Sequence, residues 1–119
     1  MERKEIEEGN KLIAEFMKLP TWQDGRYGKM YSSPIAEQSV FGDGGLLYDK
    51  RWDWLMPVVE KIENLDCIAE LSVVYHNCCI SIRNDGTRSH LISKKGNDKI
   101  ESTWCTVVEF IKWYNQNSK

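Results

Sequence analysis

The apolar residues in the second half of the chain change their spacing twice. Residues 51–65 repeat apolar side chains at intervals of three and four, which predicts an amphipathic helix. Residues 68–93 alternate apolar and polar side chains in runs separated by turn signals, which predicts three antiparallel strands. Residues 98–114 return to the helical interval. Each helix and the sheet then carries one apolar face, so we expect an α+β fold with the helices packed on one sheet face.

The two helical stripes identify the expected core. The first contains Trp54, Leu55, Val58, Val59, Ile62 and Leu65, and the second Ile100, Trp104, Val107, Ile111 and Tyr114. Between them, the run Asn84–Gly86 is a strong hairpin signal, because Asn, Asp and Gly tolerate positive φ. Asp98 is expected to cap the last helix, with Glu101 three residues later in a capping-box arrangement.

The first half of the chain is less regular. Residues 3–18 have a helical pattern that Gly9 weakens by about 1 kcal/mol relative to alanine and that Pro20 ends. Residues 20–48 are rich in glycine and aromatic residues and have no regular period, so we expect a long ordered loop with short extended pieces. We therefore predict one domain over residues 1–119: a helix plus irregular loop over 1–49, and a helix, three-stranded meander and helix over 50–119.

Composition excludes several classes of protein. The 119 residues are 41% hydrophobic and 29% charged with a net charge of −2, which is typical of a globular protein and gives no bulk attraction to nucleic acid or anionic membranes. No stretch is long and apolar enough for a membrane span, and the charged N-terminus has no apolar signal segment, so a cytoplasmic protein is expected. Cysteines 67, 78, 79 and 105 have no CxxC spacing, and we expect free thiols.

No pattern indicates catalysis or a cofactor. A zinc site built from His76, Cys78, Cys79 and His90 matches no established ligand spacing, and alternation along a strand sends the two cysteines to opposite faces. The pair His76 and Cys79 has no third group to orient it as a nucleophile and base. The FGDGG run at 41–45 lacks the Lys-Ser/Thr of a phosphate loop. We therefore predict no catalytic residue, no metal site and no cofactor, and we identify no small-molecule substrate. A small hydrolase or metal protein is kept as a third alternative.

A set of basic residues follows the predicted sheet into the last helix. Its members are Arg83, Arg88, Lys94, Lys95 and Lys99. A helix, three strands and a helix with lysines near the start of the last helix is also the order of the double-stranded-RNA-binding domain, which grips phosphates there. The resemblance is one of topology only, and the net charge over residues 50–119 is +1. These residues are a hypothetical binding site for nucleic acid.

Two aromatic residues of the last helix suggest a different surface. Trp113 points away from the predicted stripe, and Phe110 flanks it. An exposed tryptophan is covered either by the chain's own first helix or by a partner. Phe110 and Trp113 are therefore a hypothetical interface for a protein partner or for self-association.

Three runs, taken together, resemble a known group of sequences. They are EEGNKLIAEFM at 7–17, WDWLMPVVEKIE at 52–63 and VVEFIKWYN at 107–115. In this order they resemble a group of small proteins of phages and mobile elements in Bacteroides-type bacteria, to which no activity is assigned. The resemblance implies a phage-derived or prophage-encoded cytoplasmic protein and carries over no functional residue. The leading hypothesis is a non-enzymatic macromolecule-binding module, and the alternative is a nucleic-acid-binding protein.

Overall fold

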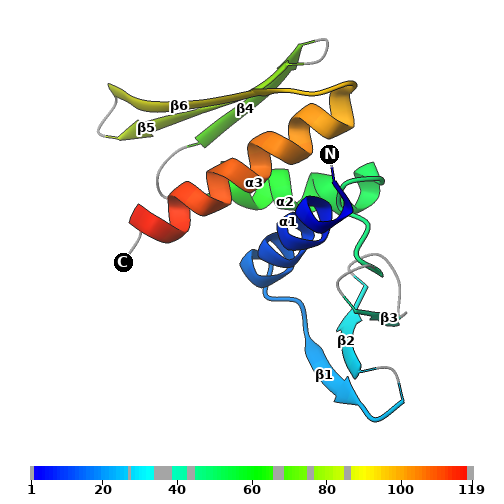
Figure 1. Ribbon diagram of the computed structural model, residues 1–119. Coiled ribbons are helices and arrows are strands. Elements are labelled where there is room, and N and C mark those ends of the chain that lie inside the picture. The colour runs from blue at the N-terminus through cyan, green and yellow to red at the C-terminus, as the bar shows by residue number, and fades with distance from the viewer. Residues whose placement is uncertain are drawn as a thin grey trace.

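The described part of the chain folds into helices and short antiparallel strands, which confirms the α+β class (Figure 1). The computed structural model describes residues 2–26, 28–33, 39–42, 45–65, 69–74, 77–84 and 87–117. In chain order the elements are α1 (Arg3–Phe16), β1 (Thr21–Asp24), β2 (Gly28–Ser32), β3 (Ser39–Phe41), α2 (Trp52–Glu63), β4 (Ala69–Val74), β5 (Asn77–Asn84), β6 (Thr87–Lys95) and α3 (Lys99–Asn117).

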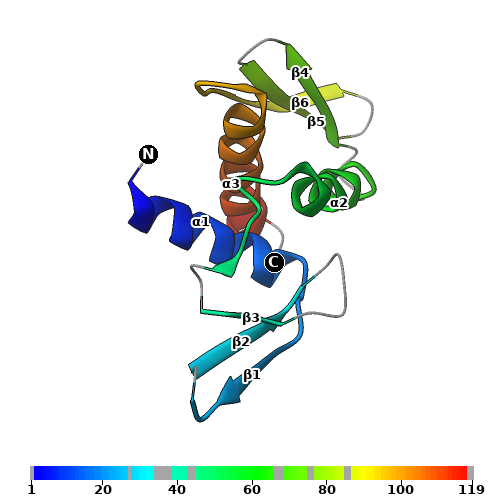
Figure 2. The ribbon, with the colours of Figure 1, turned by 90° about the vertical axis from the view of Figure 1, so that its right-hand side faces the viewer.

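The helices lie between two small sheets, and the molecule is elongated, with extents of 50 × 33 × 24 Å (Figure 2). In one sheet β5 pairs antiparallel with β4 and with β6, and a register shift falls between Ile82 and Arg83. Helix α3 contacts β5 and β6, and α2 contacts β4, from the same side of this sheet (Figure 1). The paired residues Ile80 and Ile92 are buried on that side.

The two predicted helical stripes form most of the core. Trp54 and Trp104 are both buried, as their periodicity predicted. Asp98 caps α3, because its Oδ1 accepts a hydrogen bond from the backbone N–H of Glu101 at 2.8 Å. The backbone at Gly96 approaches α3 so closely that a Cβ there would lie 2.7 Å from the nitrogen of Ser102, so only glycine fits this turn.

The segment after α1 is more regular than an irregular loop. Strand β2 pairs antiparallel with both β1 and β3, so the short extended pieces that were predicted in this segment are hydrogen-bonded to one another as a small sheet. The β1–β2 turn explains the pairing. Asp24 accepts a hydrogen bond from the backbone N–H of Arg26, and Gly28 takes a φ of +80°. Strand β2 then directs Met30 and Tyr31 into buried positions.

Helix α1 lies across α3, and Gly9 makes this close packing possible. A Cβ on Gly9 would lie 2.4 Å from Cζ2 of Trp104, so the glycine that weakens α1 locally is the residue against which the indole packs. The next residue, Asn10, is buried and accepts a hydrogen bond from Trp104 Nε1 at 2.8 Å. Its own Nδ2 donates to the carbonyl oxygen of Leu46 and to Asp49 Oδ1. One polar side chain therefore joins α1, α3 and the segment before α2.

The C-terminus of α1 is closed by its own backbone. Lys18 has a φ of 56°, and its N–H donates to the carbonyl of Glu15 while the N–H of Leu19 donates to that of Ala14. This pair of bonds is the Schellman arrangement, which turns the chain into Pro20. Lys61 of α2 adds a hydrogen bond from its Nζ to the carbonyl oxygen of Phe16, and so links α2 to the end of α1.

Candidate binding surface

The structure separates the predicted basic set into two groups. Arg83 and Arg88 are partners across β5 and β6, near the end of β5 and the start of β6. Lys94 and Lys95 stand at the other end of β6, about 20 Å away at 3.3 Å per residue. Lys99 begins α3, and all three lysines are exposed. The five residues therefore do not form one patch, and only the lysines share a corner of the fold.

The predicted aromatic interface is also divided. Phe110 is fully buried, so it cannot belong to a surface and that part of the prediction was wrong. The reason is that α3 is covered on two sides, by the sheet and by α1, which makes its buried face wider than the predicted stripe. Phe16 of α1 packs on Tyr114 at a ring distance of 5.9 Å. Trp113 packs on Phe110 and remains partly exposed on the β6 side of α3.

Two adjoining depressions run along the uncovered side of α3. The first, of about 270 Å³, lies between α1 and α3, and its floor is formed by Leu12, Trp104 and Val108. The second, of about 390 Å³, lies between α3 and β6, with Ile92 and Trp113 as its apolar part. We call the first the α1 depression, the second the β6 depression, and the two together the α3 groove.

Three charged residues belong to both depressions and form the ridge where they meet. They are Lys94 of β6 and Glu109 and Lys112 of α3. Lys112 Nζ lies 3.6 Å from Glu109 Oε1, an exposed ion pair that contributes little to stability. With Lys94 the ridge carries more positive than negative charge. The α1 depression adds Glu5 and Glu8 and is acidic. The β6 depression has Lys94, Lys112 and Glu109 as its only charged lining residues in the described part of the chain, and it is net positive.

Cys105 lines the α1 depression but is poorly suited to act as a nucleophile. Burial, followed by the negative charge of Glu101, raises the pKa of its thiol, and Lys94 only partly opposes this effect. A thiol with a raised pKa holds little of the reactive thiolate at neutral pH. The residue therefore serves as a half-buried apolar wall of the depression.

The other cysteines do not form a metal or catalytic site in the part of the chain that is described. Cys78 is buried against α3, and burial raises the pKa of its thiol. Cys79 points to the opposite face of the sheet, where its Sγ lies 3.3 Å from Ser93 Oγ, as strand alternation predicted. Cys67 and His76 lie outside the described residues, and His90 lies in β6. Among the described residues no group of three or more His, Cys, Asp and Glu residues could hold a metal ion.

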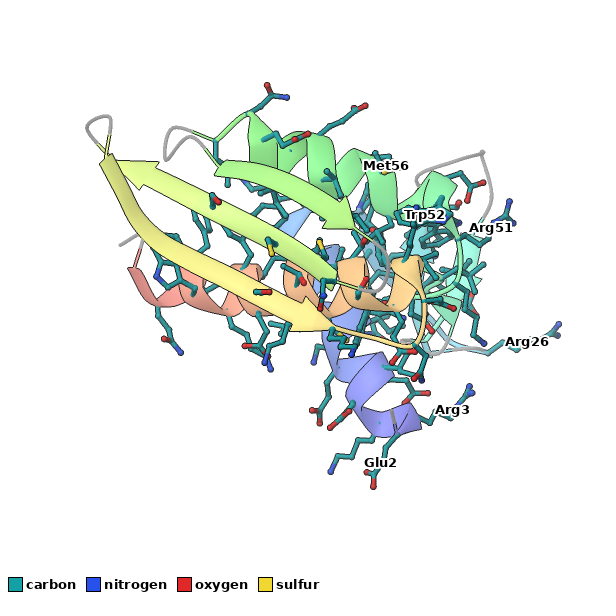
Figure 3. The ribbon with its side chains drawn as sticks, turned by 90° about the horizontal axis from the view of Figure 1, so that it is seen from above. Glu2, Arg3, Arg26, Arg51, Trp52 and Met56 are labelled. Carbon is teal, nitrogen blue, oxygen red and sulfur yellow. The ribbon has the colours of Figure 1, made fainter. Side chains whose placement is uncertain are left out.

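Three large apolar side chains are exposed elsewhere on the surface. Trp52 and Met56 lie one turn apart on α2, 40% and 43% exposed (Figure 3). Arg51 and Asp53 form an ion pair at 2.8 Å beside them. Trp22 is 43% exposed on β1. These residues are spread over two elements, and no depression of the described structure joins them to the α3 groove.

Comparisons of the chain with protein-family models, with curated proteins and with solved structures give no significant match. The described helices include none long and apolar enough to cross a membrane.

Most residues that line the α3 groove were not predicted from the sequence. Lys94 and Trp113 were among the predicted site residues, but Glu5, Glu8, Glu109 and Lys112 were not. The groove depends on the contact between α1 and α3, in which Asn10 and Trp104 are 94 positions apart in the chain. Its one signal in the sequence was Gly9, a helix-weakening residue inside an otherwise regular helix.

Proposed function

We propose that this chain is a non-enzymatic protein-binding module of phage or mobile-element origin that binds its partner in the α3 groove. The observation that carries the proposal is the groove itself, an apolar floor bordered by charged side chains along a helix that is buried on its other sides. Protein-binding surfaces commonly combine a central apolar region with a charged and polar rim.

The arrangement of residues favours a protein over a small molecule. The two depressions lie end to end and are open at the surface, whereas small-molecule sites enclose most of their ligand. The walls carry charges of both signs, which suits recognition of a patterned polypeptide. Trp113 lines the β6 depression and is partly exposed, and tryptophan is enriched among the residues that dominate binding energy in protein interfaces.

Affinity capture with matched variants tests this proposal. The immobilised protein is exposed to lysate of a Bacteroides-type host, and retained proteins are identified by mass spectrometry. The test variant is Lys94→Glu combined with Lys112→Glu, which reverses both cations of the ridge. The control variant is Lys11→Glu with Lys50→Glu, which changes the net charge equally at exposed lysines outside the groove.

The proposal predicts a protein that is retained by the wild-type chain and by the control variant and is lost from the test variant. Thermal unfolding of all three proteins shows whether each is folded. Equal retention by the two variants would contradict a role for the α3 groove, because both carry the same change in net charge.

A second function is favoured by one observation, the exposure of Lys94, Lys95 and Lys99 at the junction of β6 and α3. Three phosphate contacts would give binding to duplex DNA with a log–log salt slope of about −2.7, and a somewhat different slope for RNA. Lys95→Glu with Lys99→Glu would abolish this binding and leave the α3 groove intact, since neither residue lines it. A flat salt dependence with duplex DNA and duplex RNA would exclude this function.

A further inference from the structure

Strand β6 is an edge of its sheet. It pairs with β5 along one side over Thr87–Lys95, and no strand of the described chain pairs with its other side. Seen from above, β6 forms one long border of the sheet, with α3 running beneath it (Figure 3). Such an edge presents a row of backbone N–H and C=O groups that another extended chain can pair with.

The inner side of this edge opens into the β6 depression. Ile92 pairs with Ile80 and Lys94 with Cys78, and both partners on β5 are buried against the helices. Ile92 and Lys94 therefore face α3. Ser93 also lines the β6 depression, although its hydroxyl lies beside Cys79 on the other face of the sheet. A strand added beside β6 would alternate in the same way and place every second side chain over the β6 depression.

The charges on β6 and on the facing wall of α3 indicate which side chains an added strand would carry. Residues 87–95 contain two lysines, one arginine and one histidine and no acidic residue. Lys112 adds a further cation on the α3 wall beside Glu109, and the described lining of the β6 depression remains net positive. A second copy of β6 fits poorly, because full antiparallel overlap would set Arg88 of each chain opposite Lys94 of the other. Like charges directly opposite destabilise a strand pair, whereas acidic side chains there would stabilise it.

We propose that the partner contributes an acidic extended segment that pairs with β6 as an additional strand, with an apolar side chain seated between Ile92 and Trp113. Acidic residues two positions from that side chain face Lys94 and Lys112. This inference rests on the proposed function and specifies how the β6 half of the α3 groove is used. Backbone pairing supplies general affinity in such complexes, and the alternate side chains supply selectivity.

The test uses the isotope-labelled full chain and two ten-residue peptides. The probe alternates valine with aspartate or glutamate, and its control replaces each acidic residue with lysine. NMR titration locates binding, and amide hydrogen exchange reports whether β6 gains hydrogen bonds. The expected result is that the acidic probe shifts Ile92, Lys94, Lys112 and Trp113 and slows exchange of alternate β6 amides. Lys94→Glu with Lys112→Glu is expected to weaken binding by about tenfold or more, and Lys11→Glu with Lys50→Glu to leave it unchanged.

Several results would overturn the inference. One is absence of binding at about 1 mM probe, which would place any Kd well above that concentration. Others are equal binding of the lysine peptide, or binding without slower exchange in β6. A further contradicting result is a dimer in analytical ultracentrifugation whose β6 amides exchange slowly without any probe. In that case a second copy of the chain, and not an acidic segment, pairs with β6. All of these results leave the lysate capture experiment free to succeed, so they separate failure of this inference from failure of the proposed function.

Discussion

Substitution of Gly9 by alanine tests the packing that creates the groove, because two effects of opposite sign meet at this position. Helix propensity alone favours alanine by about 1 kcal/mol in the middle of α1. The structure opposes it, since the added Cβ would lie 2.4 Å from Cζ2 and 2.6 Å from Cη2 of Trp104. The indole would have to retreat by about 1 Å to restore an ordinary contact.

The retreat is costly because Trp104 is held on several sides. The ring is buried, and its Nε1 donates to Asn10 at 2.8 Å. Overpacking of this kind costs about 1–3 kcal/mol, and weakening a buried hydrogen bond adds about 1 kcal/mol. After the gain in helix propensity, Gly9→Ala is expected to lower the free energy of unfolding by about 1–3 kcal/mol. That corresponds to a fall in Tm of about 4–12 °C for a chain of this length.

Chemical denaturation and thermal unfolding measure this difference. Gly25→Ala is the matched control, because nothing lies within 4 Å of a Cβ placed there. It is expected to change stability by less than about 1 kcal/mol. An increase in stability on Gly9→Ala, of the size that propensity alone predicts, would refute the close approach of α1 to Trp104.

Three further substitutions have distinct expected outcomes. Asn10→Ala should cost about 2–4 kcal/mol in denaturant unfolding, since it leaves the buried Trp104 N–H without its acceptor; a cost below about 0.5 kcal/mol would argue against the polar link between the helices. Burial raises the pKa of Tyr48 above its usual 10.0, so the unfolded chain ionises first and stability falls as pH rises past about 10. Its hydroxyl has no hydrogen-bond partner among the described residues, so Tyr48→Phe should be neutral or stabilising at pH 7 and should unfold at higher pH than the wild type in an alkaline titration. Lys61→Met should cost about 1–2 kcal/mol, because Lys61 donates to the carbonyl of Phe16 and its Nζ lies 4.6 Å from the centre of that ring; unchanged stability would show that this contact is not maintained in solution.

The parts of the fold that were predicted from sequence are those in which local pattern and burial coincide. The stripe of α2 is buried at Trp54, Leu55, Val58, Val59 and Ile62, because α2 buries a single face and helical periodicity records that face directly. The Asp98 cap was predicted because it depends on residues only three positions apart.

The parts that were missed depend on very short strands or on contacts between residues distant in the chain. The β1–β2–β3 sheet has strands of three to five residues, too short to establish an alternating pattern among glycines. Phe110 was included in the hypothetical interface because periodicity within α3 does not show how far α1 widens the buried face of that helix. The α3 groove arises from the same packing of α1, so its acidic wall at Glu5 and Glu8 could be located only in three dimensions.

Hydrogen–deuterium exchange of the chain with and without its captured partner tests the central claim most directly. Binding in the α3 groove predicts slower exchange in β6 and in the second half of α3, with β1, β2 and the exposed face of α2 unchanged. Protection confined to β1 or to α2 around Trp52 and Met56, with exchange in β6 and α3 unaltered, would contradict it.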